Sequence, residues 1–260
     1  NAYSFFVTYA NIDGYVPSST PTSSLSNPLD KWIISDLEKL VKKATDAFDS
    51  YMIQDATEAL LSFIDDLNNW YIRRSRRRFW RSENDGDKKE AYDTLYRVLM
   101  TVVKVACPMV PFVTEAIYQN LKTASDPESV HLCLYPEYNE EERDFKLEEE
   151  MNIIMKTIEM GRALRASSNL KVRQPLKEFV VVSRNSAHRE NLEKNRDIIL
   201  EELNVKNVKV RGDESDLVSY SAKANFKVLG AKLGKNMKEV AALIQNFTDG
   251  EIAEILEGKA

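Results

Sequence analysis

The chain has 260 residues, of which 43% are hydrophobic, and we expect two domains of ordinary size. Its formal net charge of −5 gives no general reason to invoke binding to nucleic acid or to an anionic membrane. No apolar run approaches the roughly eighteen residues of a membrane span, and the first residues lack the order of a signal peptide. We therefore expect a cytoplasmic protein that does not bind a membrane. The two cysteines and two histidines fit no zinc-binding spacing, and no metal site is predicted.

The first part of the chain is predicted to be a connector. Residues 1–26 lack a clean hydrophobic period, and residues 16–28 (VPSSTPTSSLSNP) read as a Pro/Ser/Thr linker. Because the sequence begins with Asn1 rather than methionine, we expect a piece of a longer chain. Residues 1–27 are then the connection to a preceding domain.

The next part is predicted to be a helical bundle. Asn27, Pro28 and Asp30 form a favourable start for a helix, since asparagine accepts hydrogen bonds from free amides and proline lacks an amide hydrogen. Apolar residues at three-to-four spacing indicate a series of amphipathic helices. Their expected ranges are 28–50, 53–81, 87–107, 111–121 and 144–166. Short connections favour an antiparallel bundle over residues 28–166.

Beyond Pro175 the pattern changes to that of a small α/β domain. Strand-like stretches and helical stretches alternate, and Thr248 and Glu251 have the spacing of a capping box. The expected order is strand 177–184, helix 186–204, strand 205–210, an extended stretch 217–229, and helices 235–247 and 249–257. The predicted fold class is α+β: a mainly α-helical antiparallel bundle followed by a small α/β domain over residues 167–260.

Charge is distributed unevenly along this chain. Residues 70–81 contain six arginines and no acid, and residues 162–177 contain five basic residues and no acid. Residues 137–150, in contrast, carry eight acids. Arginine rather than lysine throughout the first stretch favours bidentate phosphate contacts and stacking on planar groups.

A helical wheel divides these arginines into two sets. Arg74 and Arg78 continue the apolar stripe of their helix, whereas Arg73, Arg76 and Arg77 lie on its flank or opposite side. Buried guanidinium groups need partners, so Arg74 and Arg78 are candidates to anchor the helix end to an acidic neighbour. The helix macrodipole favours cations only in the last turn and cannot explain the whole set. From the residues alone, a polyanion-binding surface and an internal salt-bridge network both remain open.

Aromatic residues accompany these arginines. Trp70, Tyr71 and Trp80 could stack on bases, although an aromatic residue on a helix stripe is more often part of the core. We interpret Trp70 and Tyr71 as core residues, and leave Trp80 open between the two.

Three segments together resemble a known family. These are NNWYIRRSRRRFW, ACPMVPFVTEAIYQNL and GRALRASSNLKVRQPLKEFVV, at residues 68–80, 106–121 and 161–181. They resemble the anticodon-binding region of class I isoleucyl-tRNA synthetases, in the form found in the eukaryotic cytoplasm and some bacteria. LKVRQPL (170–176) is more particular to the isoleucine enzyme. VLGAKLGKNMKEVAALI (228–244) is similar to the C-terminal junction of that family, and NAYSFFVTYA (1–10) to the segment after its catalytic domain.

The resemblance implies that this part of the enzyme holds tRNA through phosphate contacts and reads unstacked anticodon bases. We expect a monomer whose partners are isoleucine tRNA and the rest of the parent chain. The residues expected at the tRNA are Arg73, Arg76, Arg77, Arg81, Trp80, Arg162, Arg165, Lys171 and Arg173, with Trp70, Tyr71, Arg74 and Arg78 either structural or in contact with tRNA.

The sequence lacks the motifs with which this family binds ATP. Neither a His-Ile-Gly-His type motif nor a Lys-Met-Ser-Lys-Ser loop occurs. We therefore predict no catalytic residues and no cofactor in this chain, the parent enzyme using ATP in its missing catalytic domain to join isoleucine to tRNA. The alternatives are a valyl or leucyl synthetase fragment, and a helical protein-interaction module with a basic docking helix.

Overall fold

The computed structural model describes residues 1–17, 25–80, 86–212 and 221–256. The chain divides into two compact units, Asn1–Ile153 and Ile154–Ala260, so that the division lies inside one long helix, α7 (Phe145–Ser167). Each unit is described by itself.

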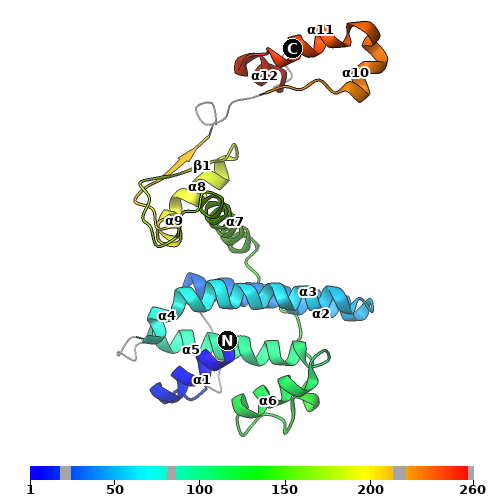
Figure 1. Ribbon diagram of the computed structural model, residues 1–260. Helices are drawn as coiled ribbons and strands as arrows, with labels where there is room; N and C mark the ends of the chain where they lie inside the picture. Colours follow the sequence, from blue (N-terminus) through cyan, green and yellow to red (C-terminus); the bar gives the residue numbers. More distant parts are fainter. Residues whose placement is uncertain (18–24, 81–85, 213–220, 257–260) are drawn as a thin grey trace. The chain divides into compact units, whose positions relative to one another are not determined.

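Unit 1 is built from helices (Figure 1). Its elements before α7 are α1 (Ala2–Asp13), α2 (Pro28–Asp49), α3 (Ile53–Asp66), the π-helical segment η1 (Leu67–Ile72), α4 (Arg73–Trp80), α5 (Gly86–Ala106), α6 (Pro111–Leu121) and the 3₁₀ turns η2 (Val130–Leu132) and η3 (Glu140–Glu142). The predicted starts and ends of α2, α5 and α6 are confirmed to within a residue or two.

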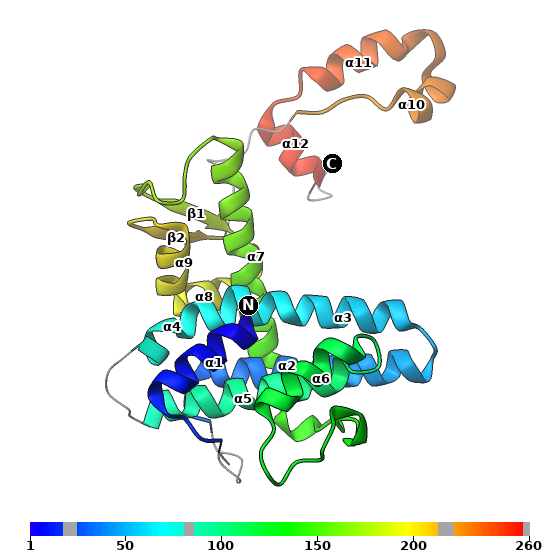
Figure 2. The same ribbon diagram turned by 60° about the horizontal axis from the view of Figure 1, so that its bottom comes forward.

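Helix α2 lies at the centre of unit 1, beside both α3 and α5 (Figure 2). It begins as predicted, because the Asn27 side chain accepts a hydrogen bond from the Leu29 amide at 2.9 Å and Pro28 occupies the first turn. Ile33 and Leu37 are completely buried. A helix buried around most of its circumference also buries polar groups, and these must find partners.

Two features of unit 1 differ from the sequence expectations. Residues 2–13, predicted to be part of an irregular connector, form α1, where Phe6 is buried against Tyr92 of α5 with ring centroids 6.2 Å apart. The helix expected over 53–81 is interrupted by η1, where the wider π turn shifts the phase of the side chains that follow. The packing of α1 against α5 is a tertiary contact, which a local hydrophobic period does not report.

Unit 2 contains a two-stranded parallel sheet of β1 (Phe179–Val182) and β2 (Val208–Arg211), with Phe179 opposite Val208 and Val182 opposite Arg211. Helices α8 (Ser186–Lys194) and α9 (Arg196–Leu203) connect the strands. The single helix expected there is divided at Asn195, whose backbone leaves the helical region. The crossover of helix between parallel strands confirms the predicted small α/β part.

The end of unit 2 is helical, with α10 (Phe226–Leu233), the 3₁₀ turn η4 (Gly234–Asn236), α11 (Met237–Gln245) and α12 (Asp249–Leu256). The extended stretch expected over 217–229 is wrong from Phe226 onward, because the Asn225 side chain caps α10 through the amides of Lys227 and Val228; residues 217–220 lie outside the described residues. The capping box is confirmed. The Thr248 amide donates to Glu251 at 2.8 Å and the Glu251 amide to the Thr248 hydroxyl at 3.4 Å.

Candidate nucleic-acid interface

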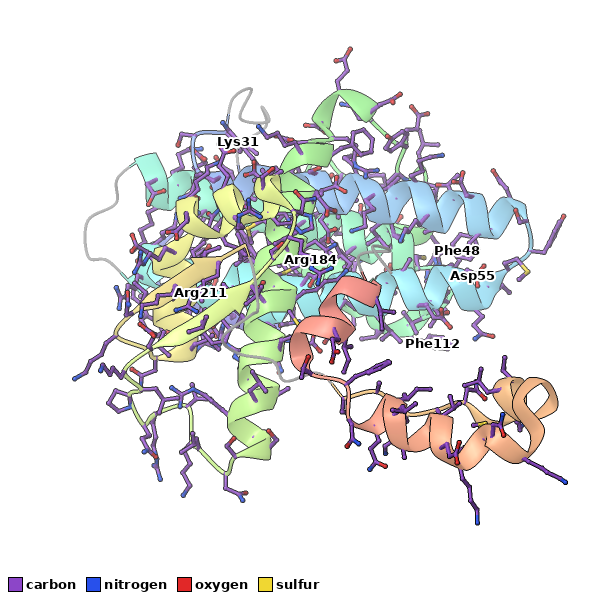
Figure 3. The ribbon with its side chains drawn as sticks, turned by 90° about the horizontal axis from the view of Figure 1, so that it is seen from above. Lys31, Phe48, Asp55, Phe112, Arg184 and Arg211 are labelled. Atoms are coloured by element: carbon purple, nitrogen blue, oxygen red, sulfur yellow. The ribbon has the colours of Figure 1, made fainter. Side chains whose placement is uncertain are left out.

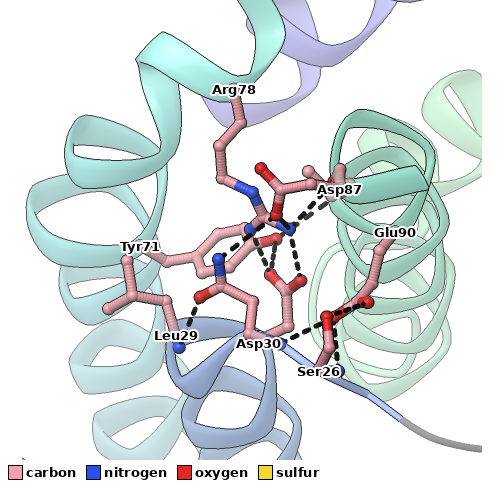
Figure 4. Close-up of polar contacts among 9 residues, drawn as sticks. Ser26, Leu29, Asp30, Tyr71, Arg78, Asp87 and Glu90 are labelled. Carbon is pink, nitrogen blue, oxygen red and sulfur yellow. Dashed lines mark hydrogen bonds and ion pairs between the residues drawn. The ribbon is translucent and has the colours of Figure 1, made fainter. Parts of the chain in front are cut away.

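A buried ion pair fixes the end of the arginine-rich helix in unit 1 (Figure 4). Arg78, 6% exposed, donates from both terminal nitrogens to the two carboxylate oxygens of Asp30 at 2.8 and 2.7 Å. The same guanidinium contacts Asp87 of α5 at 2.8 Å, and the Tyr71 hydroxyl donates to Asp30 at 2.7 Å. Three helices, α2, α4 and α5, are thereby joined at one guanidinium, as predicted for an anchoring Arg78.

The charges in this cluster are balanced by neighbouring groups. Burial raises the pKa of Asp30, while burial alone would lower the pKa of Arg78; the hydrogen bonds and charge of Asp30 outweigh that effect and raise it. Glu90 accepts hydrogen bonds from the amides of Ser26 and Asn27 at 2.8 and 2.9 Å. Burial acts to raise the pKa of Glu90, but these amides outweigh it and lower this pKa. The cluster holds the start of α2 as well as the end of α4.

The opposite side of α4 carries exposed cations. Arg76 and Arg77 are exposed, whereas Ser75 before them and Phe79 after them are buried. Trp80 is 55% exposed and lies at the same helix end. This alternation leaves a cationic and aromatic surface on a helix whose other side is anchored. The exposure of Arg76 and Arg77 agrees with the helical wheel, which placed both residues away from the buried stripe.

The remaining residues of this stretch have intermediate positions. Arg73 and Trp70 are half-buried, with the guanidinium carbon 5.8 Å from the centre of the indole ring, a cation–π geometry. Arg74 is half-buried, and Tyr71 is fully buried, as expected of a core residue. The prediction for Arg81 lies outside the described residues.

In unit 2, the predicted basic set separates into exposed and structural members. Lys171 and Arg173 are exposed in the turn that follows α7. Arg162 is half-exposed and forms an ion pair with Glu202 at 2.5 Å. Arg165, expected at the tRNA, is 4% exposed, and its terminal nitrogens donate to four backbone carbonyls of unit 2. Its donors are used inside the fold, so we remove Arg165 from the set of candidate contact residues.

Sequence reasoning gave no role to a third basic group, at the ends of the two strands. Arg184 follows β1, Arg211 ends β2, and both are labelled in Figure 3. Arg189 of α8 donates to the carbonyls of Ser183 and Arg184 at 2.8 and 2.9 Å. The carboxyl ends of parallel strands lie at one edge of a sheet, and this rule would have grouped these arginines from the sequence.

Neither a metal site nor a membrane-spanning helix is found among the described residues. Within them, no three side chains of the metal-binding types come together as a metal site. None of their helices has both the length and the apolar character needed to cross a bilayer.

Comparison with known proteins defines the class. The model of the anticodon-binding domain of tRNA ligase matches residues 30–180, more than half of the chain, so the chain belongs to this family. Among similar proteins, the isoleucine–tRNA ligase of Treponema denticola is 51% identical over 270 residues, covering 99% of this chain and 24% of the relative. Those of Protochlamydia amoebophila (43%, over all of this chain and 25% of the relative) and Bacillus cereus (isoleucine–tRNA ligase 2; 41%, over 97% and 24%) are also similar. The chain spans about a quarter of the length of these relatives.

Proposed function

We propose that this chain is the tRNA-binding, anticodon-recognising part of an isoleucine–tRNA ligase, which in full length joins isoleucine to its tRNA using ATP. The match of residues 30–180 to the anticodon-binding family carries this proposal. The relatives named above, each an isoleucine–tRNA ligase, support the choice of amino acid. These relatives come from bacteria and do not support the finer resemblance to the eukaryotic cytoplasmic form, which stays a prediction.

The surface we propose for tRNA has two parts. On unit 1 it consists of Arg76, Arg77 and Trp80, with Arg73 beside them; on unit 2 it consists of Lys171 and Arg173 in their turn, with Arg162 leading into it. Exposed guanidinium groups bind phosphates in bidentate fashion, and an exposed indole offers a stacking face to an unpaired base. The buried pair of Arg78 with Asp30 supports the first part by fixing the orientation of α4.

The other predictions about the parent protein are proposals as well. We propose that residues 1–27 connect to the catalytic domain, that residues 28–166 are the anticodon-binding bundle and that residues 167–260 form the junction domain. The parent is cytoplasmic, and this part is monomeric with no cofactor of its own. Isoleucine-dependent exchange of pyrophosphate into ATP by the isolated chain, above a buffer control, would contradict its non-catalytic role.

Titration of the chain against labelled isoleucine tRNA and an unrelated tRNA, at several salt concentrations, tests the proposal. With about four to six phosphate contacts, the logarithm of affinity falls against the logarithm of salt with a slope of about −3 to −5. We expect a modest preference for isoleucine tRNA. Equal affinity for both RNAs at every salt concentration would remove the anticodon-reading role and favour a module that docks an acidic protein. A preference for valine or leucine tRNA would instead assign the chain to those relatives.

A further inference from the structure

Arg165 is the one predicted contact residue that the structure buries among the described members of its set. One terminal nitrogen, Nη1, donates to the carbonyls of Lys171 and Gln174 at 3.1 and 3.0 Å. The other, Nη2, donates to the carbonyls of Leu203 and Asn204 at 2.6 and 3.1 Å. A single side chain therefore connects the turn after α7 to the last residues of α9.

The close packing of α7 and α9 makes this connection possible. Gly161 lies one helical turn before Arg165, and a Cβ atom there would be 2.6 Å from a methyl group of Leu203. A larger residue at this position would require the Leu203 side chain to move, and the close approach places the end of α9 within reach of the guanidinium. The carbonyls at a helix C-terminus lack intrahelical partners and carry partial negative charge, so a buried cation is well accommodated there.

The turn itself is closed by its own hydrogen bonds. The Gln174 amide donates to the Lys171 carbonyl at 2.9 Å, and the Asn204 side chain donates to the Val172 carbonyl at 3.0 Å. The carbonyls of Lys171, Val172 and Gln174 are thus all occupied by donors from within unit 2. The Lys171 and Arg173 side chains are exposed on this constrained backbone.

We propose that Arg165 is a positioning residue, which holds the turn at residues 168–176 in the conformation that presents Lys171 and Arg173 to the phosphates of tRNA. The inference rests on the proposed tRNA binding, and it moves Arg165 from contact with RNA to support of the residues that make contact. A lysine cannot replace it, because one ammonium nitrogen cannot span the two pairs of carbonyls that the planar fork reaches. Ordering the turn before binding removes an entropic cost from association.

Hydrogen–deuterium exchange of the 260-residue chain tests the positioning without RNA. In Arg165→Lys, amides of the peptide covering 168–176 should exchange faster by on the order of tenfold, through local opening, while the β1 peptide changes little. Asn204→Gly should give a smaller increase, because it removes one tie to the turn while glycine keeps the left-handed backbone of Asn204, at φ 48°. If the lysine variant does not fold, Arg165→Gln is measured in its place, because its shorter amide side chain cannot reach both pairs of carbonyls.

The control is Ile199→Val, which removes a methyl group from a fully buried side chain of α9 that is not bonded to the turn. It should leave exchange of the turn unchanged. Exchange of the turn at the parent rate in the Arg165 variant would overturn the proposal, whatever Asn204→Gly shows, as would equal acceleration in the control.

Titration with isoleucine tRNA provides the second measurement. Arg165→Lys should weaken binding by at least about twofold, and adding Lys171→Ala and Arg173→Ala should then weaken it much less than these changes do in the parent chain, because coupled residues are not additive. Losses that multiply independently would show that Arg165 acts apart from the turn and would refute its positioning role. If the parent chain binds no tRNA, the proposed function fails, while the exchange measurement still decides whether Arg165 orders the turn.

Discussion

Arg78 of unit 1 and Arg165 of unit 2 are both buried, and they are satisfied in different ways. Arg78 is paired with the carboxylates of Asp30 and Asp87, whereas Arg165 donates to four backbone carbonyls. A charge paired with a charge leaves a second charge stranded when one partner is lost. When an arginine bound to backbone carbonyls is lost, only uncharged carbonyl groups are left without a donor. Loss of the buried arginine should therefore cost more free energy of unfolding in unit 1 than in unit 2.

The largest expected effect comes from Arg78→Ala. It leaves the carboxylate of Asp30, which is completely buried, without its guanidinium, and we expect the free energy of unfolding of unit 1 to fall by about 3–5 kcal/mol. Urea unfolding followed by tryptophan fluorescence measures this. Arg76→Ala, an exposed neighbour on the same helix, should change stability by no more than about 0.5 kcal/mol. Similar losses for the two variants would contradict the division of α4 into anchored and exposed sides.

The second prediction concerns Asp66 at the end of α3, a half-buried carboxylate that, unlike Asp30, has no guanidinium among the groups that shift its pKa. Burial raises the pKa of Asp66, the charges of Asp36 and Asp65 act in the same direction, and Lys39 offsets only part of this, so that the pKa is about 6. Between pH 3.8 and about 6 the folded state holds a proton that the unfolded state has released, so stability falls as pH rises through this window.

Asp66→Asn should remove that dependence, because its amide cannot ionise. At pH 7.5 the variant should be more stable than the parent by up to about 3 kcal/mol, at roughly 1.4 kcal/mol per pKa unit, and at pH 4 the two should be nearly equal. Urea unfolding at pH 4, 5, 6 and 7.5 checks this, with Glu58→Gln as the control on an exposed carboxylate of the same helix that is not among the groups shifting the pKa of Asp66. Parallel pH profiles for Asp66→Asn and the parent would show that Asp66 titrates normally.

The third prediction tests the other half of the comparison. Arg165→Met keeps a long apolar side chain but removes the donors to four carbonyls, and we expect a loss of about 1–3 kcal/mol in the free energy of unfolding of unit 2. This is less than for Arg78→Ala, since no ionised partner remains buried. Thermal or urea unfolding of both variants under identical conditions gives the ranking. A larger loss for Arg165→Met than for Arg78→Ala would reverse the comparison.

The same two residues show what the sequence could predict. Arg78 was a candidate anchor from its place on a helical wheel, and Asp30 was predicted only as part of the start of α2; the pairing of the two was not predicted. Arg165 was misassigned, because its acceptors come from residues 171, 174, 203 and 204, and backbone carbonyls leave no mark in a sequence. Helix α1 was missed for a related reason: its Phe6 is buried by contact with distant α5. Local pattern thus predicted the helices and the exposed cations, and nonlocal packing decided the rest.

The smallest effect on stability is expected from Arg76→Ala combined with Arg77→Ala, and this variant separates anchoring from binding within one helix. Both side chains are exposed, so the free energy of unfolding should change by no more than about 0.5 kcal/mol for each. If both contact phosphates, the salt slope of tRNA binding should become shallower by about one to two, at roughly 0.7 to 0.9 per phosphate.

The matched control removes two exposed cations from elsewhere on unit 1, with Lys42→Ala and Lys43→Ala. These lie about 18 Å along α2 from Asp30, at 1.5 Å per residue, and therefore away from the anchored end of α4. The control has the same change in net charge, so a purely long-range electrostatic attraction would shift both variants alike. A salt slope that changes only in the arginine variant assigns the phosphate contacts to α4, because counterions are released only where a phosphate is neutralised. Equal slopes in the two variants would mean that tRNA responds to the overall charge of unit 1 and that the exposed side of α4 has no special part in binding.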